Sequence, residues 1–204
     1  MFDFKRPSRD YAGYIFDCDG TLADSMPLHF RAWNHGLEEG GARHRLDPHG
    51  FMTVAGMALA QTVEHWTREY GEKINLEAVV TAKNEYFEKH RGDIVPIEPV
   101  VAFAADLKAA GKPISVASGG RRDDVLWTLR HIGADHLFDI VVTADDVSTA
   151  KPAPDLFLLA AKRMGVAPAQ CYVIEDSDLG IEAADRAGMD SIRIPSFADL
   201  AEPR

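Results

Sequence analysis

Cysteine and long hydrophobic runs are scarce in this sequence. Cys18 and Cys171 are the only cysteines among 204 residues, and neither stands in the spacing of a metal or redox motif. We therefore expect two buried, reduced thiols rather than a disulfide or a zinc site. No apolar run approaches the length of a transmembrane helix, and residues 1–7 contain no apolar signal core. We accordingly expect a cytoplasmic protein that has no membrane partner.

Positive charge is also in short supply. The chain has 22 Lys and Arg against 32 Asp and Glu, which gives a formal net charge of −10. Surfaces that bind nucleic acids or anionic membranes need clustered Lys and Arg, so we expect no nucleic-acid partner. A small anionic substrate is still compatible with this charge, because a metal ion and one or two cations can reverse the sign inside a pocket. Nothing in the sequence indicates an obligate protein partner.

Short apolar segments alternate with helix-like segments over most of the chain. Strands are expected at residues 14–16, 114–117, 140–143, 171–174 and 191–194, and the intervening helices at 100–110, 123–131, 155–164 and 181–187. Alternation of this kind is typical of a parallel sheet with helices on both faces. The sequence therefore predicts an α/β protein with a Rossmann-like, doubly wound parallel sheet.

A helical block interrupts this alternation after the first strand. Helices are expected at residues 27–39, 58–70 and 76–89, with no convincing strand between residues 25 and 93. We therefore expect an inserted all-helical cap domain at residues 25–92 and a discontinuous catalytic core made of residues 1–24 and 93–204.

Polar and charged side chains follow four of the expected strands. They are Asp17 and Asp19 after the first strand, Ser118 and Gly119 after the second, Lys151 in the loop after the third, and Glu175 and Asp176 after the fourth. Because the carboxyl ends of parallel strands share one edge of the sheet, and ligands bind there in open α/β sheets, these groups should converge.

Each group alone also has an ordinary structural explanation. The Asp-Gly pair at 19–20 and the Ser-Gly-Gly run at 118–120 are common turns. Lys151 could be a solvated surface residue, and Glu175-Asp176 could be an acidic first helical turn. All four groups at strand ends, in this order, are improbable by coincidence, so we interpret them together as a site.

The chemistry of the combined groups points to phosphoryl transfer. Packed carboxylates repel one another unless a divalent cation joins them, and oxygen-only ligands favour Mg²⁺. A hydroxyl at Ser118, a backbone amide at Gly119 and the Lys151 ammonium suit a phosphoryl group. A carboxylate such as Asp17 can serve as a nucleophile.

Four segments together resemble the motifs of the haloacid dehalogenase-like superfamily. They are Phe16–Leu22 (FDCDGTL), Ser118, Lys151-Pro152 and Glu175-Asp176. The resemblance implies that Asp17 attacks phosphorus and becomes an aspartyl-phosphate, and that Asp19 acts as general acid and then general base. It also implies that Ser118 and Lys151 hold the phosphoryl oxygens.

The same resemblance implies a bound Mg²⁺. Asp17, the backbone carbonyl of Asp19, and Asp176 would ligate the ion, and Glu175 would support it directly or through water. These four residues form the expected metal set.

Within the superfamily, the chain is most similar to beta-phosphoglucomutase and its sugar-phosphate phosphatase relatives. The likeness rests on the segments HFRAW at 29–33, KPAPD at 151–155 and EDS at 175–177, and it implies that His29 helps to position the substrate or Asp19. In beta-phosphoglucomutases a cap arginine holds the substrate's other phosphate, and Leu59 falls where that arginine would be. The sequence therefore favours a Mg²⁺-dependent phosphatase of a small phosphomonoester, such as a hexose phosphate.

Two alternatives use the same fold. A beta-phosphoglucomutase-type mutase would share the core residues and return the phosphoryl group to another sugar hydroxyl. A catalytically silent binding module would be expected to lack catalytic groups, whereas none of the core set is missing.

Overall fold

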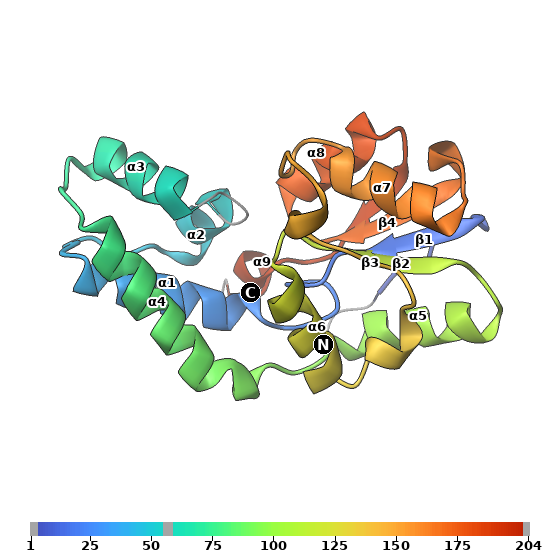
Figure 1. Ribbon diagram of the computed structural model, residues 1–204, viewed down its shortest axis with the longest axis horizontal. Coiled ribbons are helices and arrows are strands. Elements are labelled where there is room, and N and C mark those ends of the chain that lie inside the picture. The colour runs from blue at the N-terminus through green and yellow to red at the C-terminus, as the bar shows by residue number, and fades with distance from the viewer. Residues whose placement is uncertain (1–3, 55–58, 202–204) are drawn as a thin grey trace. The chain divides into compact units, whose positions relative to one another are not determined.

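The expected strands pair into one parallel sheet in the computed structural model, which describes residues 4–54 and 59–201. The strands are β1 (Gly13–Phe16), β2 (Ile114–Ala117), β3 (Val141–Val142), β4 (Cys171–Glu175) and β5 (Asp190–Arg193). Their order across the sheet is β3-β2-β1-β4-β5, and every pair is parallel (Figure 1). β1 lies at the centre, so its carboxyl end is flanked by those of β2 and β4.

Helices cover both faces of this sheet, as the sequence predicts. They are α5 (Glu98–Ala109), α6 (Arg122–His131), α7 (Asp155–Met164) and α8 (Asp178–Arg186). Side chains alternate along β1: Phe16 packs in the core with α5 and α6, whereas Ile15 packs in a second core with α7 and α8. Figure 1 shows the two pairs of helices on opposite sides of the strands. The doubly wound α/β fold is thereby confirmed.

Contacts divide the described residues into two units. One contains residues 4–24 and 94–196, and the other contains residues 25–54, 59–93 and 197–201. The second unit is helical, with α1 (Met26–Glu39), α2 (Pro48–Val54), α3 (Leu59–Tyr70), α4 (Leu76–His90) and α9 (Phe197–Ala201). This division differs from the expected boundaries because α9 packs with the helical unit, where the Phe197 ring meets Phe30 and Phe51.

Two glycines let α1 and α4 pack closely. A Cβ atom on Gly36 would lie 2.7 Å from the Val79 carbonyl oxygen, and one on Gly40 would lie 2.3 Å from Val79 Cγ2. Both distances are too short for real contacts, so only glycine permits this approach. Around this contact, Trp33, Leu37 and Val79 form part of a buried core.

The segments that enter and leave the helical unit run side by side in the core. The Asp24 amide donates to the Val95 carbonyl at 2.9 Å, and the Ile97 amide donates to the Leu22 carbonyl at 2.9 Å. Ala23 also forms an isolated bridge with Pro96.

Within the described ranges, every helix is too short or too polar to span a bilayer.

Candidate active site

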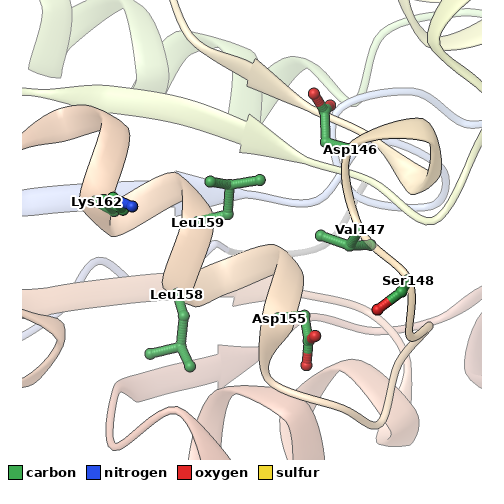
Figure 2. Close-up of a pocket in the computed structure, with 7 residues that line it drawn as sticks. All are labelled: Asp146, Val147, Ser148, Asp155, Leu158, Leu159 and Lys162. Atoms are coloured by element: carbon green, nitrogen blue, oxygen red, sulfur yellow. The ribbon is translucent and has the colours of Figure 1, made fainter.

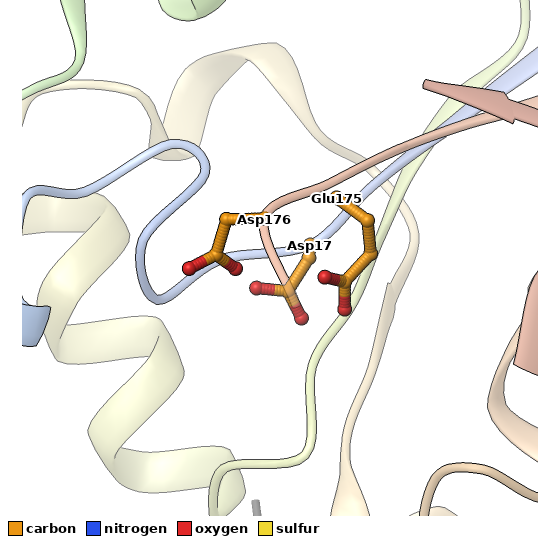
Figure 3. Close-up of side chains that lie close together, drawn as sticks. All are labelled: Asp17, Glu175 and Asp176. Atoms are coloured by element: carbon orange, nitrogen blue, oxygen red, sulfur yellow. The ribbon is translucent and has the colours of Figure 1, made fainter. Parts of the chain in front are cut away.

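Three carboxylates meet where β1 and β4 end. Asp17 directly follows β1, Glu175 is the last residue of β4, and Asp176 follows it. Pairing of Phe16 with Ile174 places these ends next to each other. One oxygen from each carboxylate lies within 4.8 Å of the others, and all three side chains are buried (Figure 3).

Lys151 lies against two of these carboxylates. Its Nζ atom donates to Asp17 Oδ1 at 2.6 Å and to Glu175 Oε1 at 2.7 Å, and its side chain is only 10% exposed. The ammonium also lies 5.0 Å from the centre of the Phe157 ring. Lys151 is therefore not a solvated surface residue, which was its ordinary structural explanation, because its side chain is largely shielded from solvent and paired with two carboxylates.

The two adjacent acids of β4 differ in how their oxygens are satisfied. Glu175 Oε2 accepts from the Ser177 amide at 2.6 Å and from Ser177 Oγ at 2.9 Å, while Oε1 accepts from Lys151. Asp176 Oδ2, in contrast, is buried and has no hydrogen-bond partner within the described part of the chain. A buried carboxylate oxygen without a partner is costly unless a cation joins it.

Burial and mutual repulsion shift the pKa values of this cluster. Burial, together with the charges of Glu175 and Asp19, raises the pKa of Asp17 to about 7, although Lys151 opposes the shift. Burial and the neighbouring Glu175 and Asp17 charges raise the pKa of Asp176 well above its usual range. Burial alone would lower the pKa of Lys151, but the two carboxylates raise it above its usual value. The Asp17, Glu175 and Asp176 cluster is suited to a divalent cation, which would favour the ionised carboxylates.

Ser118 and Asp19 lie at neighbouring turns of the same edge. Ser118 follows β2, and its Oγ atom accepts from the Gly120 amide at 3.1 Å. A Cβ atom built on Gly120 would lie 3.3 Å from Ser118 Oγ and 3.6 Å from Asp19 Oδ2, so both side chains border this turn. A Cβ on Gly119 would meet nothing within 4 Å, so its backbone faces open space.

Gly20 shapes the turn that carries Asp19. Its φ is +85°, a left-handed value that favours glycine, and its amide donates to the Ala23 carbonyl at 2.8 Å. The chain therefore reverses its direction just after Asp19.

Two expected residues lie in the helical unit. His29 is on α1, where its ring stacks on Phe87 with centroids 4.5 Å apart and an angle of 19°. Leu59, which falls where the mutases have their cap arginine, is the first residue of α3, and residues 55–58 before it lie outside the described residues.

A surface hollow near α7 is separate from these groups. Its volume is about 460 Å³, and it is lined by Asp146, Val147, Ser148, Asp155, Leu158, Leu159 and Lys162 (Figure 2). None of the expected site residues lines it.

Comparison with known proteins places these observations in a family context. The family model for haloacid dehalogenase-like hydrolases matches residues 14–194. Fructose-1-phosphate phosphatase YqaB of Escherichia coli is 36% identical over 184 residues, which cover 90% of this chain and 96% of that protein. Hexitol phosphatase A of Escherichia coli is 29% identical over 188 residues, covering 92% and 84% respectively.

A solved structure shows the same relationship in three dimensions. The crystal structure of CbbY from Rhodobacter sphaeroides in complex with phosphate aligns with a TM-score of 0.77 and 27% identity. The alignment covers 95% of this chain and 90% of that one.

Proposed function

This chain belongs to the haloacid dehalogenase-like hydrolase family, and from that membership we propose that it is a phosphatase acting on a small phosphomonoester, a sugar phosphate. The sugar-phosphate class of substrate is taken from the relatives, one named a fructose-1-phosphate phosphatase and another a hexitol phosphatase. The CbbY structure is a complex with phosphate, which supports a phosphoryl ligand for this chain as well. The reaction type is supported independently by the residues at the strand ends.

Asp17 is the proposed nucleophile. One of its oxygens attacks phosphorus, the bond between phosphorus and the sugar oxygen breaks, and Asp19 gives that oxygen a proton. A water molecule then attacks the aspartyl-phosphate, Asp19 takes its proton, and inorganic phosphate leaves with Asp17 restored. The position of Asp17 at the end of the central strand, next to Lys151, supports this role.

Lys151, Ser118 and Gly119 are the proposed phosphoryl-binding groups. The Lys151 ammonium reduces the repulsion between Asp17 and an incoming phosphate, since it already lies 2.6 Å from Asp17 Oδ1. Ser118 and the open backbone of Gly119 follow the neighbouring strand, where a hydroxyl and an amide can donate to phosphoryl oxygens.

Asp17, Asp176 and the backbone carbonyl of Asp19 are the proposed ligands of Mg²⁺. A bound Mg²⁺ supplies positive charge that neutralises the phosphoryl oxygens and orients them. The unpartnered Asp176 Oδ2 supports this assignment, since a cation would satisfy it. Both oxygens of Glu175 are already hydrogen-bonded, so we assign Glu175 to holding Lys151 rather than to direct ligation.

The helical unit, made of residues 25–54, 59–93 and 197–201, is proposed to act as a cap for the core of residues 4–24 and 94–196. Its insertion directly after the Asp19 turn supports this role, because closure could exclude water and select the substrate. Stacking of His29 on Phe87 would hold its ring in a fixed orientation for positioning the substrate or Asp19.

The observation that carries the proposal is the buried pair of Lys151 and Asp17, because an ammonium bonded to a nucleophilic carboxylate suits attack on an anion. The test incubates the protein with Mg²⁺ and a panel of sugar phosphates and measures free phosphate and sugar-phosphate isomers together. We expect phosphate release on one or two hexose phosphates, and a loss on the order of 10⁴-fold in Asp17→Asn.

Asp10→Asn is the matched control, because Asp10 precedes β1 at its opposite end and has a side chain that is 72% exposed. It should retain full activity. Failure to release phosphate from any substrate would overturn the proposal, and isomer formation with little free phosphate would establish a mutase.

A further inference from the structure

Gly180 occupies a position that no other residue could fill without moving Glu175. A Cβ atom built on Gly180 would lie 1.8 Å from Glu175 Oε1, 2.0 Å from Cδ and 2.6 Å from Cγ, and these are its three nearest atoms. The carboxylate of Glu175 therefore lies in the space that the missing side chain leaves on α8. Both residues are buried, and the Glu175 oxygens are bonded to Lys151 and Ser177, so displacing this carboxylate would break those bonds.

Ser177 holds the same carboxylate from its other side. Its amide and hydroxyl both donate to Glu175 Oε2, and the hydroxyl accepts from the Gly180 amide at 3.1 Å as the cap of α8. The start of α8 thus fixes the carboxylate at two points, and Oε1 is left directed at Lys151, 2.7 Å away.

We infer that Gly180 is a positioning residue: the space left by its absent side chain seats the Glu175 carboxylate, which Ser177 clamps and which holds the Lys151 ammonium against Asp17. This inference rests on the proposed function for its catalytic consequence, but its geometric part applies to the metal-free protein as well. Gly180 itself does not touch the reacting groups and acts only through Glu175 and Lys151.

Helix propensity makes the inference testable, because it predicts whether Gly180→Ala raises or lowers the stability of the protein. Alanine is a better helix former than glycine, so Gly180→Ala should stabilise α8 if nothing else were affected. The collision with Glu175 should reverse that sign. If Glu175 is first replaced by Ala, the space is free and the ordinary preference for Ala should return.

The experiment is therefore a double-mutant cycle of Gly180→Ala and Glu175→Ala, with thermal unfolding and steady-state kinetics of all four proteins. We expect Gly180→Ala to lower the midpoint of unfolding in the wild-type background and to raise it in the Glu175→Ala background. We expect kcat to fall on the order of 100-fold in Gly180→Ala, since small displacements of catalytic groups have effects of that size. In the Glu175→Ala background, Gly180→Ala should cause little further loss.

A direct measurement follows the Lys151 ammonium by NMR in the metal-free protein without substrate. Two buried carboxylate partners should protect its protons from exchange with water in the wild type. We expect that protection to be lost in Gly180→Ala. If Gly180→Ala fails to fold, Ser177→Ala should show a partial loss of protection, and Ser177→Thr, which keeps the hydroxyl, should restore it.

Gly50→Ala provides a matched control. Gly50 is the third residue of α2, as Gly180 is of α8, and its amide is likewise bonded to a side chain, that of Asp47. Its added Cβ would come no nearer than 3.3 Å to Asp47 Oδ1 and 3.8 Å to Leu46 Cδ2. It should therefore leave both kcat and the Lys151 signal unchanged.

Two results would overturn the inference. One is an equal fall in the unfolding midpoint on Gly180→Ala in both backgrounds, which would mean that Gly180 serves helix packing rather than Glu175. The other is an unchanged Lys151 signal in Gly180→Ala. A wild type that hydrolyses no phosphomonoester but shows a protected Lys151 would instead reject the proposed function alone.

Discussion

Asp176 is a residue whose charge the described part of the chain compensates only in part. Its carboxylate is buried beside Asp17 and Glu175, and this burial and repulsion raise its pKa well above the usual range. We expect Asp176→Asn to raise the unfolding midpoint of the metal-free protein, because a neutral amide removes that repulsion. We also expect Mg²⁺ to raise the midpoint of the wild type by binding preferentially to the folded state, and Asp176→Asn to abolish that rise. Thermal unfolding with Mg²⁺ and with a chelator measures both effects.

The exposed neighbour Asp178 supplies the control for this measurement. Its side chain is 89% exposed and pairs with Arg193, so Asp178→Asn should behave as the wild type does. An unchanged response to Mg²⁺ in Asp176→Asn would contradict the assignment of Asp176 as a ligand.

For individual residues of the site, the sequence indicates which residue types converge better than it indicates which side chains bond to one another. Asp17, Lys151 and Asp176 follow strands in a recognisable order, so their convergence could be expected from the sheet alone. Nothing local shows that Glu175 bonds to Lys151, because that contact spans 24 positions and depends on the space beside Gly180.

Among the elements, the edge strand β3 is fastened by one acidic residue. Asp146, in a 3₁₀ turn just after β3 (Ala144–Asp146), accepts from Arg122 of α6 at 2.5 Å, from Arg163 of α7 at 2.8 Å and from the Thr143 amide at 2.8 Å. Both arginines also donate to the Val141 carbonyl. These bonds join β3 to one helix from each face of the sheet.

This arrangement predicts a pH-dependent contribution to stability. Burial alone would raise the pKa of Asp146, but hydrogen bonds from Arg163 and Thr143 and the charge of Arg122 lower it from 3.8 to about 2. A depressed folded-state pKa stabilises the fold above the unfolded value, so the contribution is present above about pH 4 and lost as pH falls toward about 2. We expect Asp146→Asn to lower the free energy of unfolding by about 2 kcal/mol at pH 7.

Urea unfolding of both proteins at several pH values tests this prediction. The difference between them should shrink between about pH 4 and about pH 2. Asp139→Asn is the control, because Asp139 is 86% exposed in its pair with Lys108 and should contribute little. A difference that is constant with pH would contradict the role given to the Asp146 charge.

The elements themselves were predicted well where packing and propensity agree. The strand at 114–117 and the helix at 155–164 match the structure, whereas α2 was not expected. Its first residues, Pro48, His49 and Gly50, favour a turn, and it forms because Phe51 and Val54 are buried in the helical core. Likewise α8 begins at Asp178 rather than at 181, because Ser177 caps it.

At the scale of the whole molecule, the net charge of −10 opposes the approach of an anionic substrate. Raising NaCl from about 10 mM to about 100 mM shortens the screening length from about 30 Å to about 10 Å. We therefore expect kcat/KM for a hexose phosphate to rise severalfold over this range at saturating Mg²⁺, with kcat unchanged. Sucrose at matched osmolality should have no such effect. A fall in kcat/KM with salt would mean that local cations, rather than the net charge, govern the encounter.

The chain crosses between the helical unit and the core three times, whereas a single inserted segment would cross only twice. Residues 24 and 25, 93 and 94, and 196 and 197 each cross from one unit to the other. A chimaera that replaces only residues 25–93 with the matching segment of a relative would leave Phe197 facing foreign partners in place of Phe30 and Phe51. The two stretches of the gene that encode this unit, residues 25–93 and the segment from residue 197, therefore have to be exchanged together. Recombinants that carry them from different parents should fold poorly.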